Sequence, residues 1–266
     1  MKAHTIAIRT ILLVSYIILY VPLICVVIYS FNAAGNMAGW TGWSTKWYVA
    51  LMSNQMLWLA TWNTLKVALF SATCAAIIGT AAAIAIYKHK RFFMKPLFLA
   101  ITSMPIAIPD VVMGLSMLLF FAFLKKLTGW PTSGGLITIA IAHVTVGIAY
   151  VQEMVQARLL SYDISLEEAA MDLGSRPMKV FFTITLPVIA PAIISGWFFA
   201  FVLSVDDVIM AMFLSGPESV TLPIMIMGYM KAGAAPEINA LTGMLLLILS
   251  IIMLIVGLLI YRKKHI

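Results

Sequence analysis

Six long apolar stretches, separated by short polar segments, dominate the pattern of hydrophobic and polar positions along the chain. A helix needs about 20 residues to cross the hydrocarbon core of a bilayer, because each residue rises about 1.5 Å. The pattern predicts an all-α membrane protein with six transmembrane helices in a single domain, residues 1–266. The expected spans are Ile11–Phe31, Leu65–Tyr87, Pro96–Leu124, Leu136–Met154, Val188–Leu214 and Leu241–Tyr261.

Two other features of the apolar pattern need interpretation. Thr221–Met230 is too short to span a bilayer and is interrupted by Pro223 and Gly228, so we expect it to be interfacial or partly re-entrant. The first apolar run follows basic residues, as in a signal peptide, but it is long and five further spans follow it. We therefore expect it to be kept as the first transmembrane helix.

Composition and charge orient the expected spans. Hydrophobic residues make up 63% of the chain, charged residues 10%, and mean hydropathy is +1.04, which excludes an ordinary soluble domain. Cytoplasmic loops carry the excess of Lys and Arg, so we expect both termini in the cytoplasm. The net charge of +7 needs no nucleic-acid partner, because basic loops facing anionic lipid account for it. The expected cytoplasmic side holds Lys2, Arg9, Lys88, Lys90, Arg91, Lys95, Arg158, Arg176, Lys179, Arg262, Lys263 and Lys264, and the other side Lys46, Lys66, Lys125, Lys126 and Lys231.

Cysteine and histidine give no sign of a metal site. Cys25 and Cys74 fall inside expected spans without CxxC or Cys/His spacing, so they are expected to be packing residues. His143 lies in the fourth span with no carboxylate or cysteine near it in sequence, and we expect it to be packed and hydrogen-bonded.

Tryptophan is concentrated between the first two spans. The segment Asn32–Asn63 holds five of the seven tryptophans. It is either an aromatic belt at the outer membrane interface or a surface that a soluble partner touches.

The most polar part of the chain, Ser165–Pro187, connects the fourth and fifth spans. Ser165 and Glu168 have the S-x-x-E spacing of a capping box, which predicts that a helix begins at Ser165. The run "LEEAAMDL" favours a helix, and Gly174 is suited to end it because glycine readily adopts the left-handed conformation.

A second short helix is expected to begin near Ser175. Pro177 is tolerated in its first turn, and Pro187 marks the expected start of the fifth span. Such a helix–turn–helix is either a docking element for a cytoplasmic partner or an ordinary solvated loop.

The spacing of "EAA", Gly174 and "ITLP" resembles the EAA loop of ABC importer permeases. The resemblance implies the type I ABC importer permease fold, with a cytoplasmic loop at 158–187 that docks on an ATPase and transmits its closure to the spans. The residues that carry this coupling by resemblance are Glu168, Ala169, Ala170, Gly174, Ile184, Leu186 and Pro187.

Three further segments make the resemblance more specific than ABC importer permeases in general. Gly42–Tyr48, Ser195–Pro217 and Pro236–Met244 are similar to permease subunits of spermidine/putrescine importers. This implies polyamine import across a bacterial inner membrane by alternating access. The implied partners are a related second permease, a cytoplasmic ABC ATPase dimer and a periplasmic polyamine-binding protein, with membrane lipid around the spans. The chain has no G-x-x-x-x-G-K-[ST] phosphate loop, so we expect no catalytic residue and no cofactor in it; ATP and Mg would be bound by the ATPase.

Three aspartates, Asp110, Asp206 and Asp207, lie inside expected spans. A charged Asp near the membrane centre costs about 2.5–3.5 kcal/mol on insertion scales, and no Lys or Arg lies deep in the spans to pair with them. Their partner is expected from elsewhere: water in a cavity, a proton, the second permease or a cationic substrate. They are therefore candidates for the substrate pathway.

The fifth span adds a stripe of small and polar residues. Such a stripe faces protein or a pore, so we place its Asp207 first among the three aspartates. Asp206 lies about 100° around the helix from Asp207, where it serves either the pathway or a subunit interface. The stripe consists of Trp197, Ala200, Ser204, Asp207 and Ala211.

The third span is expected to be interrupted by Pro105 and Pro109. Asp110 follows the break directly. It is either an N-cap for the next helix or part of a mid-membrane substrate site, and the two roles are compatible.

Two other classes of function stay open. The first is a permease for another small solute such as an amino acid, although an oxyanion fits poorly with three intramembrane aspartates. The second is a stand-alone channel or an intramembrane enzyme. The sequence lacks HExxH and paired Gly-Asp catalytic motifs, and a channel has no need of an EAA loop.

Overall fold

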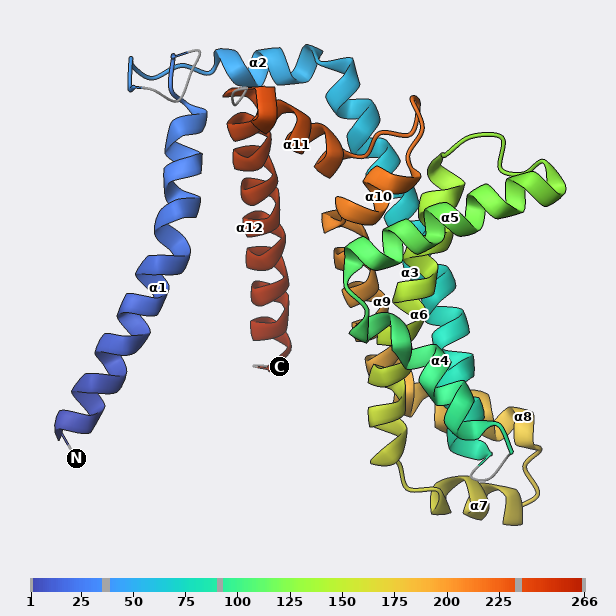
Figure 1. Cartoon of the computed structure of the whole chain (residues 1–266). Coiled ribbons are helices and arrows are strands. Elements are labelled where there is room, and N and C mark those ends of the chain that lie inside the picture. Colours follow the sequence, from blue (N-terminus) through green and yellow to red (C-terminus); the bar gives the residue numbers. More distant parts are fainter. Residues whose placement is uncertain (1, 35–38, 90–92, 233–235, 265–266) are drawn as a thin grey trace. The chain divides into compact units, whose positions relative to one another are not determined.

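In the residues that it describes, the computed structural model consists of helices and the segments that connect them (Figure 1). Within them there is no β-strand, only an isolated bridge between Asn32 and Trp43. The expected cytoplasmic residues Lys90 and Arg91 lie outside the description. The described backbone covers residues 2–34, 39–89, 93–232 and 236–264, and the described side chains exclude 2–7, 249, 252, 253 and 255–264.

Most connections between successive helices are short, the longest being residues 31–45 between α1 and α2, and a π-helical turn, η1, joins two of the helices. In chain order they are α1 (Lys2–Ser30), α2 (Lys46–Ser53), α3 (Gln55–Lys88), α4 (Lys95–Ala107), α5 (Asp110–Thr128), α6 (Leu136–Leu160), α7 (Ser165–Asp172), α8 (Pro177–Val180), η1 (Phe181–Thr185), α9 (Leu186–Asp206), α10 (Ile209–Leu214), α11 (Leu222–Ala232) and α12 (Pro236–Lys264).

Five helical runs among the described residues are long and apolar enough to cross a membrane. The sixth expected span falls in α12, a 29-residue helix of which the apolar part Pro236–Ile248 is counted as a shorter helix. The predicted all-α membrane fold is thus confirmed, and its count of six spans is approximately supported. The five runs are Ile8–Ser30, Gln55–Lys88, Asp110–Thr128, Leu136–Leu160 and Pro177–Asp206.

Contacts divide the chain into two compact units, Met1–Trp58 with Ile226–Ile266, and Leu59–Met225. In the first unit, α1, α2 and α12 meet where Ser30 Oγ and Tyr48 OH lie 2.7 Å apart. A Cβ atom at Gly243 of α12 would lie 3.0 Å from the Tyr48 hydroxyl and 3.1 Å from the Ser30 hydroxyl. The absent side chain of this glycine therefore lets the three helices approach closely.

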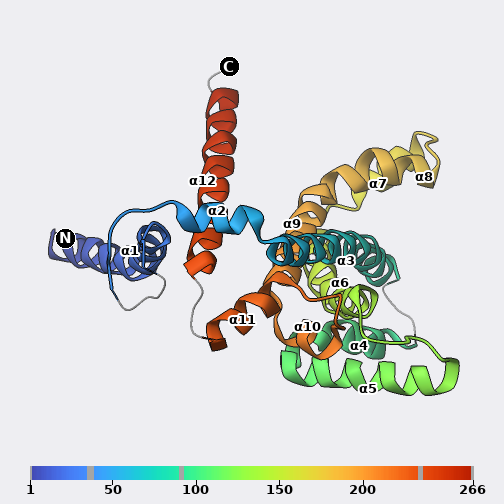
Figure 2. The same ribbon diagram turned by 90° about the horizontal axis from the view of Figure 1, so that it is seen from above.

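The second unit is built on α3, α6 and α9, which lie side by side in both Figure 1 and Figure 2. Small residues set the distances between them. A Cβ atom at Gly147 of α6 would lie 2.8 Å from Ala75 Cβ on α3 and 3.4 Å from Ala200 Cβ on α9. Close contact through Gly and Ala is typical of helices that associate inside a membrane, where lipid gives no hydrophobic advantage to bulky interfaces.

The fifth expected span begins earlier than predicted. α8, η1 and α9 form one helical run, Pro177–Asp206, so Pro187 is not its start. The Leu186 N–H donates to the Phe181 carbonyl, five residues back. This wider π-helical turn accommodates the proline that follows, which lacks an N–H and crowds the preceding turn.

The same span also ends sooner than predicted. Asp207 has an extended backbone, with φ −68° and ψ 126°, and α10 is a separate short helix. The expected stripe from Trp197 to Ala211 is therefore not on one continuous helix.

The third expected span is interrupted as predicted, at one of its two prolines. α4 ends at Ala107 and α5 begins at Asp110, so Pro109 marks the break, whereas Pro105 lies inside α4. Pro105 lies two residues before the end of α4, so the helix ends soon after it, and only Pro109 lies between the two helices.

Two smaller expectations were wrong. Pro223 and Gly228 do not interrupt their segment, because α11 is one continuous helix with the proline in its first turn, where no N–H is needed. The outer segment expected at Asn32–Asn63 ends at Asn54, so Trp58 and Trp62 belong to α3.

Candidate functional site

The polar connection in the second unit forms a short helix, α7, that begins at Ser165 as expected but by a different device. No capping box forms between Ser165 and Glu168. Instead, Asp163 Oδ1 accepts the Ser165 N–H at 3.0 Å. This hydrogen bond lowers the pKa of the Asp163 carboxyl below its usual value. The stabilisation from this hydrogen bond is thus fully present above the ordinary carboxyl pKa and is lost as pH falls through the lowered one.

The end of α7 follows the sequence prediction. Gly174 has φ +84°, in the left-handed region that favours glycine. Its N–H donates to the Met171 carbonyl at 2.8 Å, and the next N–H, of Ser175, donates to the Ala170 carbonyl at 3.1 Å. These two bonds satisfy carbonyls that a helix end leaves unpaired and fix the direction in which α8 departs.

α7 exposes a mixed polar and apolar surface. Glu168, Ala169 and Asp172 are exposed, and Ala170 is half-buried. Leu173, directly after the helix, is 89% exposed, and Met178 on α8 is 68% exposed. A helix end that presents a carboxylate beside bare apolar side chains is suited to contact another protein.

The single buried residue of α7 is Glu167, which the sequence reading did not select. Its Oε1 accepts the Thr185 hydroxyl at 2.6 Å, and its Oε2 lies 3.4 Å from Lys88 Nζ. Tyr162 is also buried here; burial raises the pKa of its phenol, and the charge of Glu167 acts in the same direction. Only the three-dimensional fold brings Lys88, from the end of α3, to this carboxylate.

The remaining coupling residues lie at the start of the long run into the membrane. Ile184 is in η1 and half-buried, and Leu186 packs against the core cluster of α3, α6 and α9. Pro187 is exposed. η1 thus joins the polar connection to the core of this unit.

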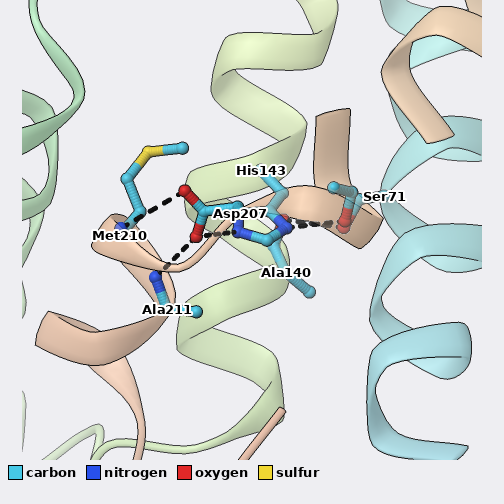
Figure 3. Close-up of polar contacts among 7 residues, drawn as sticks. Ser71, Ala140, His143, Asp207, Met210 and Ala211 are labelled. Carbon is cyan, nitrogen blue, oxygen red and sulfur yellow. Dashed lines mark hydrogen bonds and ion pairs between the residues drawn. The ribbon is translucent and has the colours of Figure 1, made fainter. Parts of the chain in front are cut away.

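A second group of polar side chains lies inside the spanning helices of the same unit, around His143 of α6 (Figure 3). His143 Nδ1 is 2.6 Å from Ser204 Oγ, and its Nε2 is 3.2 Å from Asp207 Oδ2. All three side chains are almost fully shielded. The expectation that His143 is packed and hydrogen-bonded is confirmed.

Asp207 also organises the backbone where the helix is broken. Its carboxylate accepts the Ala211 N–H at 2.8 Å and the Met210 N–H at 3.3 Å, as Figure 3 shows. It therefore begins α10 while bonding to His143 of α6. The expectation that its partner comes from outside the chain was wrong, because that partner lies 64 positions away in sequence and adjacent in the fold.

The other two aspartates are in different surroundings. Asp206, the last residue of α9, is exposed and has no hydrogen-bond or ion-pair partner within the described part of the chain. Asp110 is exposed too and is the first residue of α5. The N-cap reading of Asp110 was wrong: Pro109 occupies that position, and no side chain caps the helix.

The stripe residues of α9 contact protein within this unit. Ala200 and Ser204 are buried. Trp197 is half-buried, donates its Nε1–H to Thr73 Oγ1 of α3 at 3.1 Å, and stacks on Phe201 with ring centroids 5.5 Å apart. The stripe is thus an internal helix contact.

One carboxylate inside an expected span was missed by the sequence reading. Glu153 lies in α6 and is exposed, and its Oε1 accepts the Ser103 hydroxyl of α4 at 2.8 Å. Glu153 is a carboxylate inside the expected span Leu136–Met154, one residue before its end, and this position in the sequence could have identified it.

Metal chemistry has no support among the described residues, where no three His, Cys, Asp or Glu side chains come close enough to hold an ion. Cys25 is exposed and Cys74 is half-buried, and neither forms a disulfide.

This arrangement of spanning helices, with broken segments and a polar helix–turn–helix in one connection, is typical of a transport permease of the membrane. Residues 75–264 match the family described as binding-protein-dependent transport system inner membrane component, and the chain belongs to that family.

Two relatives from Escherichia coli (strain K12) are similar over most of their length. The putrescine transport system permease protein PotI is 47% identical over 236 residues, which is 89% of this chain and 84% of the relative. The spermidine/putrescine transport system permease protein PotC is 38% identical over 249 residues, or 94% of this chain and 91% of the relative.

Solved structures support the importer-permease fold. A chain of a bacterial ABC transporter involved in the import of the acidic polysaccharide alginate aligns with a TM-score of 0.69 and 15% identity, covering 98% of this chain and 96% of that one. A chain of the MetNI methionine ABC transporter aligns with a TM-score of 0.61 and 23% identity, covering 80% and 99%. At these identities the likeness concerns the fold alone.

Proposed function

We propose that the chain is one permease half of an ATP-driven importer that carries putrescine or spermidine across the bacterial inner membrane by alternating access. The observation that carries this proposal is the 47% identity, over 89% of the chain, to a permease named for putrescine transport. The similarity of a second relative named for both polyamines supports the same substrate class.

The proposed assembly pairs this chain with a related second permease, a cytoplasmic ABC ATPase dimer and a periplasmic polyamine-binding protein. The exposed surface of α7, with Glu168, Ala169 and Leu173, is the proposed ATPase contact. ATP and Mg then bind to the ATPase, and this chain needs no cofactor. The ordered helix end at Gly174, with its two backbone hydrogen bonds, favours a docking element over a solvated loop.

In the proposed substrate pathway, Asp206 is the first candidate for contact with the substrate, ahead of Asp207 and Asp110. The C-terminal end of α9 carries unpaired carbonyls and a negative partial charge, and Asp206 adds an exposed carboxylate there. A helix ending at membrane depth in this way favours a cation such as an ammonium group. Asp207 has its acceptors occupied by His143 and by two backbone N–H groups, so its contribution is to hold the broken helix.

The proposed orientation places both termini and α7 in the cytoplasm. In the second unit Lys88, at the end of α3, is paired with α7, and Arg158 bonds to the Val188 carbonyl. Basic residues thus gather where α7 lies, as expected for the cytoplasmic side.

Transport by the complete complex tests the proposal. The chain is co-expressed with its partner subunits, reconstituted in liposomes and supplied with ATP, binding protein and radiolabelled putrescine, spermidine or amino acids. We expect ATP-dependent uptake of at least one polyamine and no uptake by this chain alone.

Uptake of an amino acid in place of polyamines would replace the substrate assignment and leave the permease class standing. Transport or catalysis by the isolated chain would instead favour a channel or an enzyme and would contradict the proposal.

A further inference from the structure

Glu167 occupies a position at which an apolar residue is expected. It is the only buried residue of α7, and its carboxylate lies against Thr185 and Lys88. Removing a carboxylate from water is unfavourable, and a well-packed apolar side chain often stabilises such a site more. The Glu167 side chain is 10% exposed while that of Lys88 is 43% exposed, so the pair is weak support for stability, and the burial of the carboxylate favours a directional contact.

The two partners of Glu167 belong to different parts of the second unit. Lys88 is the last residue of α3, and Thr185 is the last residue of η1, directly before α9 begins at Leu186. Since α3 and α9 share the buried core of this unit, Glu167 connects the exposed helix α7 to both of them. The 2.6 Å bond from Thr185 is short, as expected when a hydroxyl donates to an ionised carboxylate.

Apart from this contact, α7 is joined to the spans by its packing against α8 and η1 and by its chain connections. Residues 161–164 precede it and residues 173–176 follow it, and neither segment is part of a helix. The turn at Gly174 fixes the direction of α8, and the charge-assisted hydrogen bond from Thr185 adds a direct link from α7 to the residue before α9. Thr185 lies in the π-helical turn, a form of helix that is often found at functional sites.

We propose that Glu167 is the positioning residue that transmits movement of α7 to α3 and α9, through Lys88 and Thr185 respectively. This proposal rests on the proposed function, since the movement is the one that a docked ATPase would impose. Glu167 thus has a role within the chain, whereas its neighbour Glu168 is exposed. Glu167 itself, being buried, is not part of the surface that an ATPase touches.

The test uses the complete reconstituted complex and measures solute uptake, ATP hydrolysis and the amount of assembled complex for each variant. Glu167→Gln removes the charge and keeps the shape, and Thr185→Val removes the hydroxyl donor. Thr185→Ser retains the donor. Thr183→Val is the matched control, because Thr183 is exposed and bonds only to the Lys179 carbonyl four residues back.

We expect uptake per ATP hydrolysed, normalised to assembled complex, to fall about tenfold in Glu167→Gln and Thr185→Val, which corresponds to the loss of one hydrogen bond to a charged group. ATP hydrolysis should persist. Thr185→Ser and Thr183→Val should keep the wild-type ratio. The double variant Glu167→Gln with Thr185→Val should be no worse than Glu167→Gln alone, because Thr185 acts only through Glu167.

A wild-type ratio in Glu167→Gln and Thr185→Val would overturn the proposal. So would a loss of uptake explained wholly by less assembled complex, because Glu167 would then only stabilise the fold. Failure of the proposed function is recognised separately, in the wild-type complex: if it imports another solute, the same ratios are measured with that solute.

Discussion

At the scale of single residues, Asp206 and Asp207 are neighbours in sequence with opposite surroundings. The Asp207 carboxylate accepts two backbone N–H groups and faces His143, and its side chain is 8% exposed. Asp206 is exposed and sits at the negative end of α9. The carboxylate that is free to meet a cation is therefore the one outside the small-residue stripe.

Substitution by asparagine separates the two roles. Asp206→Asn should lower the initial rate of polyamine uptake about tenfold at an unchanged membrane level, because it removes the charge that we propose pairs with an ammonium group. Asp207→Asn should have a smaller effect, since its amide oxygen can still accept the N–H groups that begin α10. Uptake rate and immunoblotted membrane abundance are measured together for both variants.

Asp207→Ala is the informative companion variant. It leaves His143 and two backbone N–H groups without their acceptor, at a cost of about 1–3 kcal/mol for an unsatisfied buried group, so membrane abundance should drop. Wild-type uptake in Asp206→Asn together with severe loss in Asp207→Asn at normal abundance would reverse these assignments.

The sequence identified some of these residues but not their relations. Asp207 and Ser204 were found because aspartate and a small-residue stripe are rare in an apolar span. Their bonds to His143 could not be predicted from the sequence. His143 of α6 lies 61 residues before Ser204 and 64 residues before Asp207. Glu167 was missed for a similar reason, because its burial depends on the packing of α7 against Lys88 and Thr185.

At the scale of elements, the direction of α8 relative to α7 depends on one backbone conformation. Gly174 has φ +84°, and a Cβ atom there would meet no neighbouring atom. Only backbone strain, and not a clash, therefore restricts which residue can occupy the position. Substitutions at this position therefore test the backbone conformation without adding a steric clash.

Gly174→Val should insert in the membrane but lose most coupled uptake, because the left-handed conformation costs a β-branched residue more than the roughly 1–2 kcal/mol typical of L-residues. Gly174→Asn is the matched control, since asparagine tolerates that conformation. Uptake and co-purified ATPase are measured for both. Equal, normal uptake and co-purification in the two variants would show that the bend does not aim the docking helix.

The two breaks in the spanning helices differ in how far the sequence predicts them. The break before α5 follows Pro109, whose missing N–H and fixed φ are visible in the sequence. The break at Asp207 has no proline or glycine beside it. It depends on the carboxylate turning to bind the first N–H groups of α10 and His143, a tertiary effect that overrides the strong helical pattern of the span.

At the scale of the whole molecule, the alternation of apolar and polar segments predicted an all-α membrane protein, and composition alone excluded a soluble one. It did not predict the ends of the helices. α3 extends from Gln55 to Lys88, well beyond the apolar run Leu65–Tyr87. Leu57 and Ala60 in this extension are buried, so contacts within the protein, and not the apolar run alone, set the length of α3.

The orientation of the chain in the membrane is the last prediction, and it depends on the distribution of Lys and Arg rather than on any relative. A variant with Cys25 and Cys74 replaced by serine serves as the background, since these are the only cysteines. On it, Ser161→Cys, before α7, should react with a membrane-impermeant thiol reagent only in inside-out vesicles. Ser133→Cys, between α5 and α6, should react in spheroplasts. Both serines are exposed, and they lie in the connections at the two opposite ends of α6. Labelling in the opposite pattern would place α7 outside the cell, where no ATPase could reach it.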